Sequence, residues 1–109
     1  MTLLEDFKAA GLNIRKNWQI QPKLPFGVLL VSYSVRGADS DPDLIADATI
    51  EVDFAAEDVD EKAEEQIEEI LAAHGYAYAK SREWLSSEKM FQTTYMTTTT
   101  CKKAQVKEI

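Results

Sequence analysis

The sequence predicts an α+β fold in which a mostly antiparallel sheet of four to five strands carries two helices on one face. Residues 44–54 alternate apolar and polar side chains, as expected of an antiparallel strand with one wet face. Residues 57–75 repeat apolar side chains at helical spacing. The predicted order is helix, two or three strands, helix, then two strands, all within one domain of 109 residues.

The first third of the chain predicts a short helix followed by two strands. Thr2 is suited to cap the helix and Gly11 to end it. Residues 12–21 contain spaced apolar side chains and predict a first strand. Residues 26–35 predict a strand whose first half is apolar on both faces, which is typical of a position in the middle of a sheet.

In residues 44–54 one row of side chains is expected to face the core and the other to face solvent. The inward row comprises Leu44, Ala46, Ala48, Ile50, Val52 and Phe54, and the outward row comprises Asp47, Thr49, Glu51 and Asp53. Residues 36–43 are rich in turn formers and predict the loop that precedes this strand.

The helix predicted over residues 57–75 is strongly acidic. Asp58 stands where a capping residue is expected, and Gly75 is suited to end the helix. Eight acids and one base lie between residues 57 and 69, a net charge of −7 that equals the charge of the whole chain. The apolar stripe that should pack on the inward row comprises Val59, Ala63, Ile67, Ile70, Leu71 and His74. The other face is expected to be either a solvated surface or a surface for a basic partner, formed by Glu64, Glu65, Glu68 and Glu69.

Residues 90–100 predict the last strand because they are rich in β-forming side chains. One face carries Phe91 and Tyr95, and the other carries Met90 and Met96. Nothing after this strand is expected to pair with it, so it should leave an open edge or an uncovered face. Residues 102–109 lack periodicity and are expected to fray.

Composition disfavours several classes of function. One cysteine and one histidine allow neither an internal disulfide nor a multi-cysteine or multi-histidine metal site. A pI near 4.6 argues against an unaided nucleic-acid binder. The longest apolar run is too short to cross a membrane, and acids stand where a signal peptide needs bases, so cytosolic synthesis without export is expected.

Only one stretch resembles a metal loop. Asp39, Asp41 and Asp43 match the opening of a calcium loop, which then needs Gly at its sixth position and Glu at its twelfth. Those positions hold Leu44 and Ile50. A turn in which Asp side chains bond the backbone is therefore the favoured interpretation.

The remaining candidate residues favour structural roles. His74 stands at a helix end, where an imidazole meets the negative end of the dipole, and Cys101 has no second cysteine for exchange. Trp18 and Trp84 lie near basic residues, but the net charge disfavours a site for single-stranded nucleic acid. No phosphate loop or nucleophile elbow is present, so neither catalytic residues nor cofactors are expected.

Three sequence blocks occur in a set order: PFGVLLVSY at 25–33, ATIEVDF at 48–54 running into DVDEKAEEQIEEIL at 58–71, and WLSSEKMFQTTYMT at 84–97. Together they resemble the small tail completion proteins of long-tailed phages and prophages, which include tail terminators and head–tail joining proteins. Similar proteins place a strand with an Ile-Glu pair before an acidic helix with E-x-x-I-E steps. The chain departs from that pattern in lacking a basic residue before the acidic helix, and in its threonine run and lysine-rich end.

The resemblance implies a tail-terminator-like fold and a virion structural protein without catalysis or cofactor. It implies a ring of identical subunits, expected to be six, that ends the tail tube and/or joins the tail to the head. The expected partners are other copies of the chain, the tail tube protein and head–tail connector proteins, with no membrane and no sequence-specific nucleic acid. The expected location is the virion, after assembly in the host cytoplasm.

In such a ring the last strand and the loop over residues 37–43 are expected to reach the adjacent subunit. The predicted contact residues are Asp39, Asp41, Phe91, Tyr95 and Met96. A different class stays open, a small acidic adaptor or inhibitor that imitates nucleic acid or binds a basic factor, and its support is the acidic helix. A small enzyme subunit is a third class, with no motif in its favour.

Overall fold

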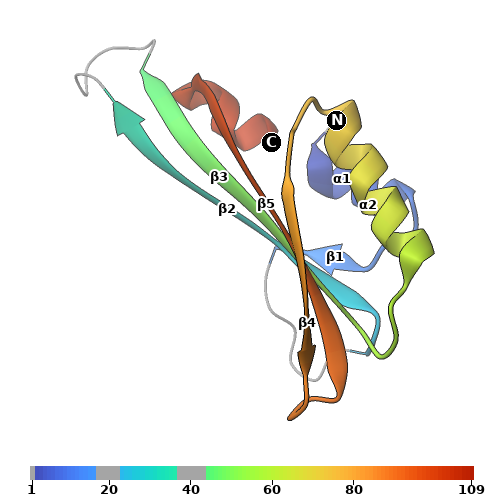
Figure 1. Cartoon of the computed structure of the whole chain (residues 1–109). Coiled ribbons are helices and arrows are strands. Elements are labelled where there is room, and N and C mark those ends of the chain that lie inside the picture. Colours follow the sequence, from blue (N-terminus) through green and yellow to red (C-terminus); the bar gives the residue numbers. More distant parts are fainter. Residues whose placement is uncertain (1, 17–22, 37–43) are drawn as a thin grey trace.

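The computed structural model describes residues 2–16, 23–36 and 44–109 (Figure 1). The chain is α+β, with a mostly antiparallel sheet and both α-helices on one face, as predicted. The elements in chain order are α1 (Leu3–Ala9), β1 (Ile14–Arg15), β2 (Phe26–Arg36), β3 (Ile45–Ala56), α2 (Glu61–Ala73), β4 (Ala79–Leu85), β5 (Met90–Lys102) and the 3-10 helix η1 (Lys103–Glu108). We call the helix-covered side of the sheet the inner face and the opposite side the outer face.

The strands lie in the order β1-β2-β3-β5-β4. β1 runs parallel to β2 and pairs with it only at Gly27 and Val28, whereas the other neighbours are antiparallel. The strand predicted over residues 12–21 is thus two residues long in the described part, and residues 17–22 lie outside it. The predicted position of residues 26–35 in the middle of the sheet is confirmed only at Gly27 and Val28, where β2 has β1 on one side and β3 on the other. Beyond Val28, no described strand covers the edge of β2 that faces away from β3.

Of the two alternatives predicted for the last strand, the open edge is wrong, whereas the uncovered face agrees with the exposure of Met96 on the outer face. β5 lies inside the sheet, paired with β3 on one side and β4 on the other. The physical reason is that β4 and β5 form a hairpin, in which Leu85 pairs with Met90. The strand that precedes β5 in the sequence therefore pairs with the edge of β5 that was predicted to be open. Among the described strands, the sheet edges are therefore formed by β4 and, beyond β1, by β2.

The helix α2 begins later than the capping pattern at Asp58 predicted. Asp60 is its N-cap, and its carboxylate accepts a hydrogen bond from the Ala63 N–H at 3.1 Å. Val59 therefore precedes the helix and is exposed, although the pattern placed it in the buried stripe. The predicted stop is confirmed, because Gly75 follows the helix with φ of +81°.

The core lies between the inner face of the sheet and the two α-helices. The predicted packing of the acidic helix on the inward row is confirmed by complete burial of Ile67 and near-complete burial of Leu71 beside Ile50 and Val52. The buried cluster comprises Leu3, Phe7, Ile14, Leu29, Ile50, Val52, Phe54, Ala56, Ala63, Ile67, Leu71 and Tyr95.

The C-terminal residues are ordered against the sheet, and the predicted fraying is wrong. Lys103 N–H donates to the Leu44 carbonyl at 2.8 Å, and Leu3 N–H donates to the Ile109 carbonyl at 2.6 Å. The Ile109 side chain packs against the core. Tertiary contacts thus hold a segment that has no periodicity of its own, since η1 lies against β3 and β5.

The sheet is longer than the helices that cover it. The 13-residue strand β5 spans about 40 Å, whereas the 13-residue helix α2 spans about 20 Å. The molecule measures 48 × 27 × 23 Å, and Figure 1 shows the sheet projecting past α2 at both ends. None of the described helices is long and apolar enough to span a membrane.

Candidate interaction surface

An ionic cluster joins α2 to β4 and β5. The Glu64 side chain is buried, and its carboxylate binds the Lys80 ammonium at 2.8 Å, the Arg82 guanidinium, and the Thr93 hydroxyl at 3.0 Å. Burial acts to raise the pKa of Glu64, but the hydrogen bonds from Lys80, Arg82 and Thr93 outweigh it and hold the pKa below its usual value. A buried carboxylate with all its partners in place is a structural element, not a free docking group.

Glu68 belongs to the same cluster. Its carboxylate accepts hydrogen bonds from the Tyr95 hydroxyl at 2.8 Å and the Tyr78 hydroxyl at 3.3 Å, and it binds Lys80 at 2.9 Å. Tyr95 is 1% exposed, and burial followed by the Glu68 hydrogen bond raises its pKa. Tyr95 is therefore a core residue, which corrects its assignment as a subunit contact.

The four acids predicted to form one surface divide into two pairs. Glu65 and Glu69 are exposed, whereas Glu64 and Glu68 face β4 and β5. The physical reason is that β4 presents two cations on its inner face, and these neutralise two acids spaced one turn apart on the helix. The alternation of Lys80 and Arg82 in the sequence was a signal that could have revealed this pairing.

Of the other predicted contact residues, Phe91 and Met96 lie on opposite faces of the sheet. Phe91 is half-buried against the Trp84 ring, with ring centroids 4.8 Å apart, at the hairpin end of β4 and β5. Met96 lies on the outer face and is 43% exposed. Asp39 and Asp41 lie outside the described residues. Sequence reasoning missed Trp84 as a surface residue, although its side chain is 48% exposed.

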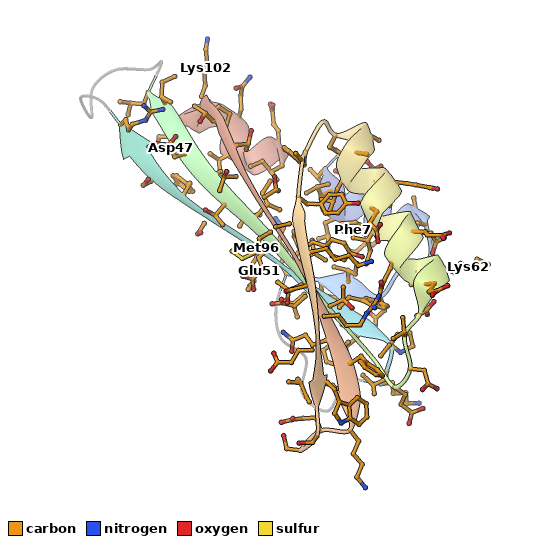
Figure 2. The ribbon with its side chains drawn as sticks, in the orientation of Figure 1. Phe7, Asp47, Glu51, Lys62, Met96 and Lys102 are labelled. Atoms are coloured by element: carbon orange, nitrogen blue, oxygen red, sulfur yellow. The ribbon has the colours of Figure 1, made fainter. Side chains whose placement is uncertain are left out.

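The outer face of β3 carries two carboxylates in contact. Glu51 shares a hydrogen bond with Asp53, and this bond, together with burial and the charge of Asp53, raises the pKa of Glu51 to about 7. Asp53 faces outward as predicted but is buried, and it accepts a hydrogen bond from the Thr94 hydroxyl at 2.8 Å. Figure 2 shows Glu51 beside Met96, its partner in the register of β5.

The raised pKa predicts a pH-dependent stability. Between pH 4.5, the ordinary pKa, and about 7, the folded protein holds a proton that the unfolded chain releases, so stability falls as pH rises through this window. Replacing Glu51 with Gln should stabilise the protein by about 1–2 kcal/mol near pH 8, less than the full shift implies because the outer face is partly open to water.

Thermal unfolding of wild type and E51Q at several pH values measures this effect. The two proteins should differ least below about pH 4.5 and most above about pH 7. A constant difference in melting temperature across that range would contradict a shared proton between Glu51 and Asp53.

The edge of β2 beyond β1 borders a cleft. The cleft has a volume of about 320 Å³ and lies between this edge, α1 and the C-terminal segment. Its apolar lining includes Leu4, Val31, Tyr33, Val106 and Ile109. Backbone groups at an uncovered strand edge, next to an apolar cleft, form a surface that an additional strand can extend.

The residues singled out for chemistry have structural surroundings. His74 Nε2 lies 2.5 Å from Asp6 Oδ2 and joins the end of α2 to α1. Cys101 is a free, half-buried thiol on β5. Within residues 2–16, 23–36 and 44–109, no three His, Cys, Asp or Glu side chains are grouped so that they could hold a metal ion.

The strand edges of β2 and β4 and the hairpin end of the sheet, where Trp84 is exposed, are thus the surfaces with the strongest case for function. We found no match for the chain among protein-family models or among curated proteins.

Proposed function

We propose that this protein is a non-enzymatic structural subunit of a phage or prophage virion, which assembles into a ring that terminates the tail tube and/or joins the tail to the head. The observation that supports it best is the exposed apolar surface of the sheet. Large apolar side chains are exposed on four strands: Leu30, Tyr33 and Val35 of β2, Ile45 of β3, Trp84 of β4, and Met96 of β5. Leu30, Ile45 and Met96 lie on the outer face and the other three on the inner face, so both faces of the sheet expose apolar area. Exposed apolar area of this kind is typical of proteins that assemble.

The two edges of the sheet favour a ring over a twofold dimer. One edge is formed by β2 and the other by β4, and their sequences differ. A contact between unlike surfaces is head-to-tail, and repetition of a head-to-tail contact closes into a ring when the rotation between subunits allows it. The family resemblance supplies the expected ring size of six.

The acidic adaptor is less well supported by the same geometry. Two of the four acids that suggested a partner surface, Glu64 and Glu68, are neutralised by Lys80 and Arg82 within the chain. The remaining exposed pair, Glu65 and Glu69, is what a solvated helix face ordinarily carries.

We expect the purified protein to form closed rings at high concentration or on isolated tail tubes. Sedimentation velocity and negative-stain electron microscopy measure this directly. Deleting the gene from a phage or lysogen that carries it should give tails of abnormal length or tails without heads, and the wild-type gene should restore normal particles. Normal tails joined to heads in the deletion strain would contradict the proposal.

A further inference from the structure

We propose that β4 of one copy pairs with residues 30–36 of β2 in the next copy, the part of this edge that no described strand covers, so that the sheets continue from subunit to subunit. This inference rests on the proposed ring and names the strands that join its members. It follows from the direction of the backbone groups, the length of the two edges, and the side chains that they carry.

The uncovered side of β2 can be assigned residue by residue. Gly27 N–H donates to the Asn13 carbonyl at 2.8 Å, on the side where β1 lies. Backbone groups of alternate residues in a strand point to the same side. The N–H and C=O groups of Val31, Tyr33 and Val35 therefore point to this side, where no described strand pairs beyond Val28.

The same alternation identifies the outward-pointing residues of β4. In an antiparallel pair of strands, two residues directly opposite each other form one of two arrangements. Either the backbone groups of both residues point toward the partner strand, or those of both residues point away from it. Applied along the register from β2 through β3 and β5 to β4, this rule assigns the outward groups to Lys80, Arg82 and Trp84.

The two edges match in direction and in face. On both edges, the residues whose backbone groups point outward have side chains on the inner face of the sheet. Residues that form a hydrogen-bonded antiparallel pair must have their side chains on the same face, so the two edges can pair. β2 and β4 run in opposite directions, because three successive antiparallel pairings separate them. Copies in the same orientation thus bring β4 antiparallel to β2, with all helices on one side of the joined sheet.

The register between β4 and β2 of the next copy follows from the lengths of the two strand edges. β1 occupies the edge of β2 at Gly27 and Val28, which leaves residues 29–36, and the last seven of these match the seven residues of β4. Full overlap places Ala79 opposite Arg36. Two further cross-copy pairs bring apolar side chains together at one end, Trp84 with Val31 and Leu85 with Leu30. A third, Arg82 with Tyr33, places an arginine near an aromatic ring in the middle.

This register also places Trp84 at the cleft. Val31 and Tyr33 line the cleft of about 320 Å³, a space of about ten water molecules and thus ample for one indole ring. Within a chain Ala79 is level with Leu30, so pairing it with Arg36 of the next copy staggers the subunits by six residues. A stagger between strands is what a closed arrangement of tilted strands requires.

Disulfide trapping tests the register. In a Cys101→Ser background, Ser32→Cys and Glu83→Cys would stand opposite each other on the outer face, as a non-hydrogen-bonded pair within disulfide reach. Oxidation at millimolar protein should give a ladder of covalent multimers that reduction removes. The matched control combines Ser32→Cys with Ala79→Cys, which lies on the same strand four residues out of register and should give no ladder.

Single-cysteine variants distinguish the other ways of pairing. A covalent dimer of Ser32→Cys alone would mean that β2 pairs with its own copy, and would overturn the proposal. A ladder from the control pair instead of the Ser32–Glu83 pair would overturn the register.

A backbone variant gives an independent readout. Tyr33→Pro removes an N–H that points away from β3, so the variant should fold and melt cooperatively yet lose multimers in sedimentation. Unchanged multimers from folded Tyr33→Pro would contradict the pairing. Wild-type rings without a ladder from the Ser32–Glu83 pair would refute this pairing and leave the ring proposal standing, whereas absence of any multimer, free or on tail tubes, would refute both.

Discussion

Replacing Ile67 with Asp is expected to unfold the protein. Ile67 is 0% exposed at the centre of α2 and belongs to the cluster that contains Ile50 and Val52 of β3. The substitution removes apolar contacts and places a carboxylate where the surrounding core side chains are apolar, which costs several kcal/mol and is comparable to the whole stability of a small domain. Urea denaturation followed by far-UV circular dichroism measures the change in the free energy of unfolding.

Val59→Asp is the matched control, since it makes the same kind of exchange at a site that the sequence pattern grouped with Ile67. Val59 lies before α2 and is 37% exposed, so its replacement should alter stability by only about 0.5 kcal/mol. Equal loss of stability in the two variants, or a soluble Ile67→Asp protein with an unchanged melting temperature, would contradict the observed packing of α2.

Replacing Glu64 with Lys is expected to have the second large effect. The new ammonium would stand beside Lys80 and Arg82, which lose their shared carboxylate, and Thr93 would lose its acceptor. Breaking a buried ion pair costs about 3–5 kcal/mol, and the added repulsion increases the loss. The same denaturation experiment measures it.

Glu65→Lys is the control for charge and helix propensity. Glu65 is the next residue of α2 and is exposed, so its reversal should change the free energy of unfolding by about 0.5 kcal/mol or less. If both reversals were equally mild, Glu64 would be a solvated residue and the ionic cluster would contribute little. If Glu65→Lys were as harmful as Glu64→Lys, the effect would come from the helix charge as a whole.

The sequence by itself determined the elements whose cause is local. The alternation in residues 44–54 sets the buried and wet rows of β3 because side chains alternate along any strand. Thr2 and Gly75 mark helix ends through bonds and dihedral angles that involve only their neighbours. Fold class followed from the order of these elements.

Only the tertiary structure decided which segments meet. The helix sequence does not distinguish a glutamate that binds a cation on a neighbouring strand from one that is solvated. Glu64 and Glu68 face the sheet because Lys80 and Arg82 of β4 lie beside them in the folded protein. Tyr95 is buried for the same reason, since α2 supplies the acceptor for its hydroxyl.

The candidate interaction surface was likewise decided by the tertiary structure. The uncovered edge of β2 exists because the described β1 pairs with only two of its residues, and the edge on β4 exists because the hairpin places β5 inside the sheet. Propensity states that a segment prefers an extended backbone, but the pairing of strands depends on long-range contacts among all of them. Residues that appear equivalent along the chain, such as Trp84 and Tyr95, therefore become surface and core only when the sheet has formed.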